Sequence, residues 1–297
     1  MSAVIDVSPE QISPRVRRRK RHALIVRALL LAATTFAIFA LGVLLWTVVS
    51  RGYDWLSWGL ITNAASRRPA RAGLNTALLG TIWVISLTAI MAFPVGIGAA
   101  IFLEEYASQN KFSKIIQVNI ANLAGVPSVV YGLLGLGVFV EFLNLGRVIL
   151  AGALTMALLS LPVIIIASQE ALRSVPLSLR QAAYGVGATR WQVVRHHVLP
   201  AAMPGILTGT ILAVSRAIGE TAPLLVVGAS GFLTTKPNGF LDKYTVLPVQ
   251  IYNWTSLAQN DFKNGLAPAG IIVLLAVLLL MNSFAIILRQ RFTTRND

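Results

Sequence analysis

The sequence predicts an all-α membrane protein with six transmembrane helices. Of its 297 residues, 56% are hydrophobic and 12% are charged, whereas soluble domains carry about 25% charged residues. The mean hydropathy is +0.71. Six apolar segments have the length of about 20 residues that a helix needs to cross a bilayer. The chain contains no cysteine, which excludes disulfides and thiolate metal sites.

The first apolar segment covers residues 29–49 and follows the basic run RVRRRKRH. A secretory signal peptide can also begin with basic residues. Its apolar part, however, is about 7–15 residues long, and TVVSRGYDW after this segment is a poor cleavage site. We therefore expect a retained first span, preceded by a disordered basic tail of residues 1–28.

Five further apolar segments follow, at residues 75–103, 120–142, 148–168, 203–227 and 266–288. They contain prolines, among them Pro94, Pro127, Pro162 and Pro223, which a transmembrane helix tolerates where its neighbours satisfy the freed backbone carbonyl. The third segment is also interrupted by Gly125, two residues before Pro127. Together the segments predict a helical bundle.

The positions of lysine and arginine predict the orientation of this bundle. Sixteen of the 25 basic residues lie on the side of the two termini, eight lie on the other side, and Arg216 lies within a span. Because cytoplasmic loops carry an excess of these residues, we expect both termini in the cytoplasm. The cluster of Arg67, Arg68 and Arg71 on the opposite side reduces the difference in basic residues between the two sides.

The net charge of +14 could also indicate a nucleic-acid-binding protein. The basic residues, however, flank the apolar segments, where they meet lipid headgroups. We therefore expect the lipid bilayer, and no nucleic acid, as the partner of these charges.

The chain divides into four predicted parts. These are a cytoplasmic tail at residues 1–28, the first span with its outer loop at residues 29–70, a core of five spans at residues 71–288, and a cytoplasmic tail at residues 289–297.

The connection between the fourth and fifth spans, residues 169–205, is longer than a tether needs to be. LSLRQAAYGVG predicts a helix that ends at its glycines, and ATRWQVVRHHVL predicts a second helix. The second has apolar residues at spacings of three and four, at Trp191, Val194 and Val198. The two helices could also be an amphipathic hairpin on the lipid headgroups.

The histidines are His22, His196 and His197. Adjacent residues on a helix point about 100° apart, so the last two form a poor pair of metal ligands, and no third ligand is near. We expect no metal site and no Ser/His/Asp set of an intramembrane enzyme. The sequence also lacks the G-x-x-x-x-G-K-[ST] phosphate loop.

An arginine and a glutamate stand inside the fifth apolar segment, in VSRAIGETAPLL. Arg216 and Glu220 are four residues apart, so they share one face of a continuous helix. Charges inside a span are costly and usually face a translocation path. There the Arg216 guanidinium would match two oxygens of a tetrahedral oxyanion. Glu220 would accept a hydrogen bond from a protonated oxyanion such as phosphate, and would repel sulfate, which has no proton to donate.

A structural role of this pair also stays open, in three forms. The two charges could neutralise each other within the helix, or they could bridge neighbouring spans. They could also lie near the membrane surface and extend into the headgroups. Arginine before glutamate is the weaker order at this spacing, which argues against a purely stabilising role.

The long connection resembles the EAA signature of bacterial ABC importer permeases. The matching residues are Gln181, Ala182, Ala183, Gly187, Leu199 and Pro200. Gln181 stands where the family has glutamate, and His197 stands where it usually has an apolar residue. The resemblance implies a cytoplasmic coupling helix that docks on a partner ATPase, and a rigid Leu-Pro connection to the next span.

Three segments resemble the permeases of phosphate ABC importers: SRAIGETAPLL, NLAGVPSVVYGLLGL and LNTALLGT. The resemblance covers about residues 70–288. It implies a type I ABC importer permease of the bacterial cytoplasmic membrane, with Arg216, Glu220 and Thr221 on the substrate path.

The same resemblance implies the partners. A PstC-like second permease would complete the path, and a dimer of PstB-like ATPases would bind ATP and Mg, so that this chain binds no cofactor. A PstS-like binding protein would deliver phosphate to outer loops such as residues 231–265.

Other classes stay open from the residues alone. One is an ABC permease for sulfate, molybdate or an amino acid, and another is a proton-driven carrier in which Glu220 titrates. The long connection argues against a carrier, because a carrier has no ATPase to contact, and no internal repeat is detectable. A purely structural membrane subunit is a further alternative.

Overall fold

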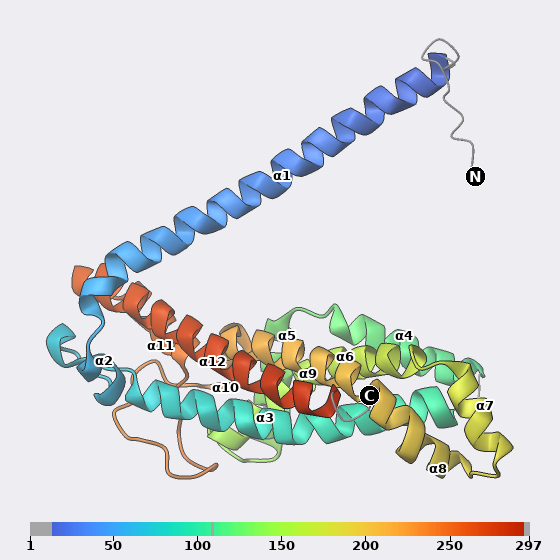
Figure 1. Ribbon diagram of the computed structural model, residues 1–297. Helices are drawn as coiled ribbons and strands as arrows, with labels where there is room; N and C mark the ends of the chain where they lie inside the picture. Colours follow the sequence, from blue (N-terminus) through green and yellow to red (C-terminus); the bar gives the residue numbers. More distant parts are fainter. Residues whose placement is uncertain (1–13, 108–109, 294–297) are drawn as a thin grey trace. The chain divides into compact units, whose positions relative to one another are not determined.

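The computed structural model describes residues 14–107 and 110–293, and these residues form helices and loops without a β-strand (Figure 1). The chain has two compact units, Met1–Arg51 and Gly52–Asp297. Five described helices are long and apolar enough to cross a membrane, or six if one bent pair counts as a single span. The predicted all-α membrane fold is therefore confirmed, and six spans are reached when the bent pair is one of them.

The first unit consists, in its described part, of α1 (Pro14–Gly52) up to Arg51. Residues 14–28 belong to this helix, so the predicted disorder of residues 1–28 is wrong for this part, and residues 1–13 lie outside the described residues. The reason is local. Arginine, lysine, alanine and leucine favour a helix, and proline is tolerated in the first turn, so the helix of the span extends toward the N-terminus.

The second unit is built around three long helices that pack on one another, and a fourth packs on the last of them. In chain order they are α3 (Asn75–Ile101), α6 (Ile149–Arg173), α9 (Leu199–Gly219) and α12 (Ala267–Thr293). α3 continues into the π-helical turn η4 (Phe102–Tyr106). These helices correspond to the second, fourth, fifth and sixth apolar segments of the sequence.

Small residues allow α9 and α6 to approach closely. A Cβ atom at Gly205 would lie 2.8 Å from the Cβ of Ala171, and a Cβ at Gly209 would clash with the Cβ of Ala167. Both helices thus present small residues at an interval of four. This arrangement is typical of helix pairs in membranes, where close packing replaces the hydrophobic effect as the driving force.

The third apolar segment forms a bent pair. α4 (Lys111–Ala124) ends before Gly125, and a second helix begins after Pro127 at an angle of 102°. The second helix comprises α5 (Ser128–Gly135) and the π-helix η5 (Leu136–Phe142). The predicted interruption of this segment is confirmed.

The fifth apolar segment was expected to be one helix, and this expectation is wrong. α9 ends at Gly219, and α10 (Ala222–Val227) begins after two residues. Pro223 has no N–H group, so it cannot donate to the carbonyl of Gly219, and a continuous helix would lose that bond. Glu220 takes an extended conformation at the break, with φ −73° and ψ 122°.

The long connection forms the predicted helix, turn and helix. α7 (Leu177–Gly185) is followed by α8 (Arg190–Val193) and the π-helix η6 (Val194–Val198), which continues into α9. Gly187 in the turn has φ +83°, a left-handed conformation that favours glycine. The side chain of Thr189 caps α8.

Short helices and loops cover the end of the second unit that lies opposite α7 and α8 (Figure 1). They are η2 (Tyr53–Trp55), α2 (Trp58–Thr62), η3 (Pro69–Arg71), α11 (Leu247–Ser256) and η7 (Asp261–Leu266). The rings of Trp254 and Phe262 are buried there with centroids 6.1 Å apart. We refer to the two ends of the unit as the α7 end and the α11 end.

Candidate functional site

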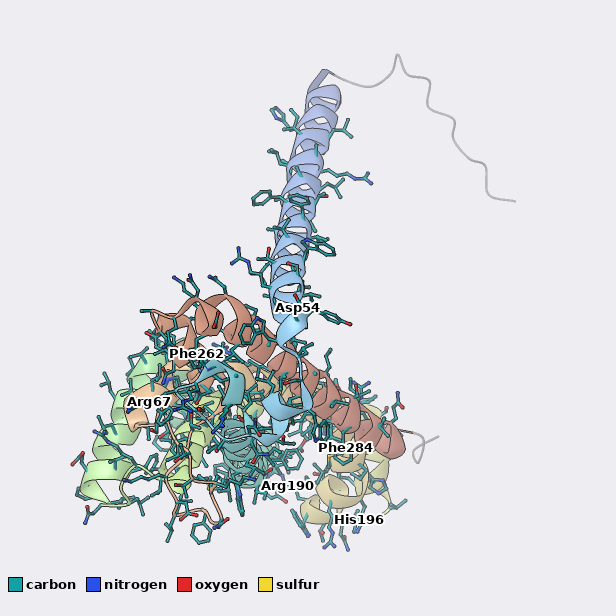
Figure 2. All side chains as sticks on the ribbon, turned by 90° about the vertical axis from the view of Figure 1, so that its left-hand side faces the viewer. Asp54, Arg67, Arg190, His196, Phe262 and Phe284 are labelled. Carbon is teal, nitrogen blue, oxygen red and sulfur yellow. The ribbon has the colours of Figure 1, made fainter. Side chains whose placement is uncertain are left out.

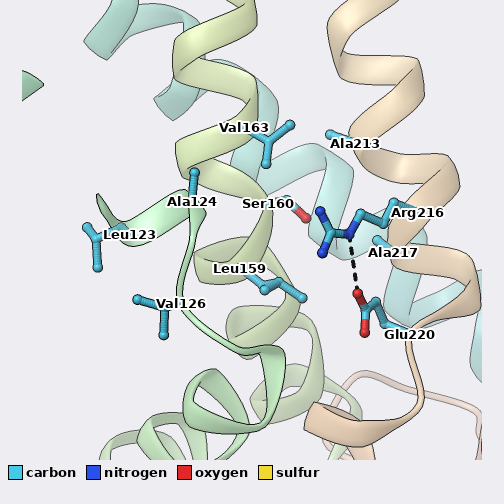
Figure 3. A pocket seen from close by; sticks show the side chains of 10 residues that line it. All are labelled: Leu123, Ala124, Val126, Leu159, Ser160, Val163, Ala213, Arg216, Ala217 and Glu220. Carbon is cyan, nitrogen blue, oxygen red and sulfur yellow. Dashed lines mark hydrogen bonds and ion pairs between the residues drawn. The ribbon is translucent and has the colours of Figure 1, made fainter. Parts of the chain in front are cut away.

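A pocket forms between the two helix breaks and the middle of α6 (Figure 3). α5 packs on α10, so the break between α4 and α5 faces the break between α9 and α10. The lining residues are Leu123, Ala124, Val126, Leu159, Ser160, Val163, Ala213, Arg216, Ala217 and Glu220. Among them only Arg216 and Glu220 are charged, so the pocket is an apolar space with one ion pair.

Arg216 and Glu220 form this ion pair across the end of α9. Nε of Arg216 lies 3.4 Å from Oε1 of Glu220. The expectation that both residues share a face of one helix is wrong, because Glu220 follows the last helical residue. The extended backbone at Glu220 nevertheless places its carboxylate beside the guanidinium (Figure 3).

The two side chains differ in accessibility. The side chain of Arg216 is 67% exposed and that of Glu220 is 18% exposed. Arg216 lies in the last turn of α9, where the free carbonyls of the helix end favour a cation. An ion pair this exposed contributes little to stability. The guanidinium is therefore held in place by Glu220 and the helix end, and most of its surface stays available for another group.

The structure adds Ser160 of α6 to the pocket, a residue that sequence reasoning missed. Its hydroxyl donates to the carbonyl of Met156 at 2.8 Å, and Figure 3 shows the oxygen on the side of the pocket that carries Arg216. The sequence offered only a weak signal, a lone serine within an apolar segment. Thr221 precedes α10 and is partly buried, but it is not among the residues that line the pocket.

The segment with the EAA resemblance presents small and polar residues at the surface of the α7 end. Gln181, Ala182 and Gly187 are exposed, whereas Ala183 is buried against the core that includes Val193 and Val198. α7 is therefore anchored by one face and open on the other.

Large apolar side chains stand beside this open face. Val186 in the turn and Trp191 in α8 are both exposed, as expected of a surface that another protein or the lipid headgroups cover. Leu199 and Pro200 open α9 directly after η6, so the segment joins the span without a loop.

His196 and His197 are both exposed, and His196 lies at the surface in Figure 2. Within residues 14–107 and 110–293, no group of three or more His, Cys, Asp or Glu side chains is placed to hold a metal ion.

Comparison with known proteins relates most of the chain to one family. Residues 92–294 match the model of the family described as binding-protein-dependent transport system inner membrane component. The phosphate transport system permease protein PstA of Haemophilus influenzae is 32% identical over 271 residues, which are 90% of this chain and 93% of that protein. PstA 1 of Mycobacterium tuberculosis is 33% identical and covers 83% of this chain and 82% of its own length. The probable ABC transporter permease protein YqgI of Bacillus subtilis is 31% identical over 85% of this chain and 89% of its length.

Solved structures agree on the fold. A subunit of a bacterial ABC transporter for the acidic polysaccharide alginate superposes with a TM-score of 0.61 at 19% identity, over 93% of this chain and 98% of that chain. A chain of the MetNI methionine ABC transporter gives a TM-score of 0.58 at 15% identity, over 74% and 95%. The predicted resemblance to PstA-type permeases and the predicted importer fold are thus confirmed. The chain belongs to the family of binding-protein-dependent transport system inner membrane components.

Proposed function

We propose that this chain is one of two permease subunits of an ATP-driven importer of inorganic phosphate. The observation that carries the proposal is the exposed Arg216 guanidinium, held by Glu220 at a pocket between two broken helices. Broken helices inside a membrane are tolerated where they line a cavity or are buried in protein. A charged pair at such a place is an expected feature of a substrate path.

The chemistry of the pair suits phosphate. A guanidinium can donate two parallel hydrogen bonds to a tetrahedral oxyanion. The carboxylate of Glu220 can accept a hydrogen bond from a P–OH group. Sulfate at neutral pH has no such proton and would meet only repulsion at Glu220. The Thr221 hydroxyl, next in the chain, is proposed as a further polar group on the path.

The small size of the pocket supports a shared path. The cavity volume is about 20 Å³, which is room for about one water and too little for phosphate. We therefore propose that the exposed side of Arg216 faces space that another chain encloses. A PstC-like permease is the proposed second half, and its surface would complete the path opposite Arg216.

We place the α7 end and both termini in the cytoplasm, because 16 of the 25 basic residues belong to that side. PstB-like ATPases would dock there on Gln181, Ala182, Ala183 and Gly187 and would bind ATP and Mg, while this chain binds no cofactor. The exposed small residues of α7 allow close approach of a partner. Leu199 and Pro200 would carry the motion of the docked segment into α9.

The α11 end would then face outward, where a PstS-like binding protein would dock. This end carries a pocket of about 460 Å³, whose lining includes Arg67, Phe232, Asn253 and Phe262. The Arg67 guanidinium lies 5.6 Å from the centre of the Phe232 ring. A basic, partly aromatic pocket of this kind suits an acidic loop of the binding protein.

Uptake of radiolabelled phosphate tests the proposal. Cells that lack the gene would be complemented with wild type, Arg216→Gln or Arg147→Gln at equal membrane abundance, with sulfate uptake measured in parallel. Arg147 is a matched control, because it is an exposed arginine outside the pocket lining. Wild type and Arg147→Gln should restore phosphate uptake, and Arg216→Gln should not. Normal uptake by Arg216→Gln would refute the site, and failure of wild type would refute the substrate.

A further inference from the structure

Three consecutive residues of η4 each contact an arginine from a different helix. We call them the acceptor triplet: Glu104, Glu105 and Tyr106. They close the helix that α3 begins, at the α7 end of the second unit. The three pairs are Glu104 with Arg173 of α6, Glu105 with Arg180 of α7, and Tyr106 with Arg190 of α8.

The central pair is largely buried, and the Arg180 guanidinium donates three hydrogen bonds. Nη2 of Arg180 donates to Oε1 of Glu105 at 2.8 Å and to the carbonyl of Leu172 at 2.9 Å. Nη1 donates to the carbonyl of Val175 at 2.7 Å. The side chains of Arg180 and Glu105 are 14% and 9% exposed. One guanidinium therefore joins α7 to the end of α3 and to the end of α6.

This geometry depends on the shape of the arginine. Leu172 belongs to the last turn of α6, and its carbonyl accepts from the N–H of Val175, just past the helix, as well as from Arg180. The planar guanidinium reaches this carbonyl, that of Val175 and a carboxylate at once, which a lysine ammonium on a flexible stem does not reproduce. Without Arg180, Glu105 would be a buried charge with no counter-ion.

The outer two pairs of the triplet differ from the central one. Arg173 and Glu104 lie 2.9 Å apart, and their side chains are 45% and 19% exposed. Both residues belong to the ends of spans, so this pair joins two spans and includes no residue of α7 or α8. The Arg190 guanidinium lies 5.2 Å from the centre of the Tyr106 ring, a cation–π contact that adds a weaker link from α8.

The covalent chain connects α7 only to α6 and, through α8 and η6, to α9. A polar contact of α7 with the end of α3 is made by side chains that stand 75 residues apart, Arg180 and Glu105, beside the apolar core that Ala183 shares with Leu103. Arg180 directly precedes Gln181, the first residue of the EAA-like segment. A displacement of α7 would therefore reach α3 through this ion pair.

We propose that the Arg180–Glu105 pair is a coupling link, which makes α3 move with α7 when the ATPases act on α7. The proposal rests on the proposed function as an ATP-driven permease. Arg180 is a positioning residue in this role and does not contact the substrate. The pair lies at the end of a span and outside the exposed face of α7. Its loss should therefore reduce the transport obtained per ATP hydrolysed, while the ATPases still dock.

The first test measures coupling in the purified importer complex, reconstituted in liposomes. Radiolabelled phosphate uptake and ATP hydrolysis would be measured for wild type, Arg180→Lys, Glu105→Gln and the control Arg173→Lys. We expect the two variants of the central pair to keep the ATPases bound. The phosphate taken up per ATP should fall by about 2- to 30-fold, the range found for residues in coupling networks. Arg173→Lys keeps a positive charge beside Glu104, in the same turn as Glu105. It should leave the phosphate taken up per ATP unchanged.

Two results of this test would overturn the link. An unchanged ratio in both central variants would show that the pair transmits nothing. A loss of bound ATPase, with hydrolysis and uptake falling in parallel, would assign the pair to assembly. Absence of phosphate uptake by the wild-type complex would instead contradict the proposed substrate.

A second measurement tests directly whether α3 moves with α7, which rates of hydrolysis and uptake do not show. The chain has no cysteine, so spin labels can be attached to single cysteines at the exposed positions Phe102 and Leu177. In the complex with Arg180, the distance between the labels should be the same without nucleotide and in the ADP–vanadate state that forms when ATP is hydrolysed in the presence of vanadate. With Arg180→Lys, the distance should change between these states. A change that is equal in both complexes would refute the proposal, whatever the transported anion is.

Discussion

Nε of Arg216 lies 3.4 Å from Oε1 of Glu220, although the helix that carries the arginine ends at Gly219. The two charges therefore pair across a break in the backbone. The arginine stands on the last turn of α9, and the glutamate stands on extended backbone directly after it. The position of the carboxylate therefore depends on the conformation of the break and not on the helix alone.

The first prediction concerns anion discrimination. Glu220→Gln keeps the size of the side chain and removes the charge that would repel sulfate. We expect phosphate uptake to fall about tenfold or more, because a hydrogen bond to a charged group contributes about 1.5–3 kcal/mol. We also expect sulfate to compete with phosphate, which it should not do in wild type. Competition assays with both labelled anions measure this, and unchanged selectivity would remove Glu220 from the path.

A second prediction concerns the turn after α7. Gly187 has φ +83°, which costs a residue with a side chain about 1–2 kcal/mol. Gly187→Leu should shift the turn and reduce the amount of ATPase that copurifies with the permease, together with phosphate uptake. Gly185→Leu is the matched control, because Gly185 lacks a positive φ and has open space around its Cβ position. An equal loss of copurifying ATPase in both variants would mean that ATPase binding depends on the exposed surface here and not on the conformation of the turn.

The close contact of α6 and α9 gives a third prediction. A side chain at Gly209 would collide with Ala167, and overpacking of this kind costs about 1–3 kcal/mol. We expect Gly209→Leu to lower the midpoint of thermal unfolding in detergent. Gly98→Leu in α3, where the space beside the glycine is open, should leave it unchanged. A midpoint for Gly209→Leu equal to that of wild type would show that the two helices are not in contact at this position.

Tyr244 gives a fourth prediction, on alkaline stability. The side chain is fully buried, and its hydroxyl has no hydrogen-bond partner among the described residues. Burial raises the pKa of Tyr244 above its ordinary value, since the charged form is disfavoured there. The neutral form is therefore retained in the folded chain. Stability from this group is present below the ordinary tyrosine pKa of about 10 and is lost as pH rises above it.

Tyr244→Phe removes both the unpaired hydroxyl and the titration. At pH 7 the variant should be as stable as wild type or more stable, by up to about 1–3 kcal/mol. Above about pH 10 it should lose less stability than wild type. Thermal unfolding of both proteins across this pH range measures the difference. A variant that is less stable at pH 7 would indicate that the hydroxyl has a partner in the assembled complex.

Much of the fold could be predicted because its signals are local. Span length and composition identify apolar helices one at a time, and proline and glycine mark where the third segment bends. The turn at Gly187 and the spacing from Gln181 to Pro200 are also local patterns. For the same reason the helix, turn and helix of the connection could be predicted, together with the family that this spacing indicates.

The tertiary structure decided what depends on distant residues. Pro223 lies within the predicted fifth span, but the resulting break at Glu220 becomes a pocket only because α10 packs on α5 and Ser160 of α6 closes the side. The pair of Arg180 with Glu105 joins residues 75 positions apart, and no periodicity in either segment indicates the other. The sequence by itself therefore determined which apolar segments form helices and where the third segment bends, whereas the break of the fifth segment at Glu220 was not predicted. Packing decided which bends meet and which charges are paired, because contact between helices depends on the shapes of surfaces that are far apart in the chain.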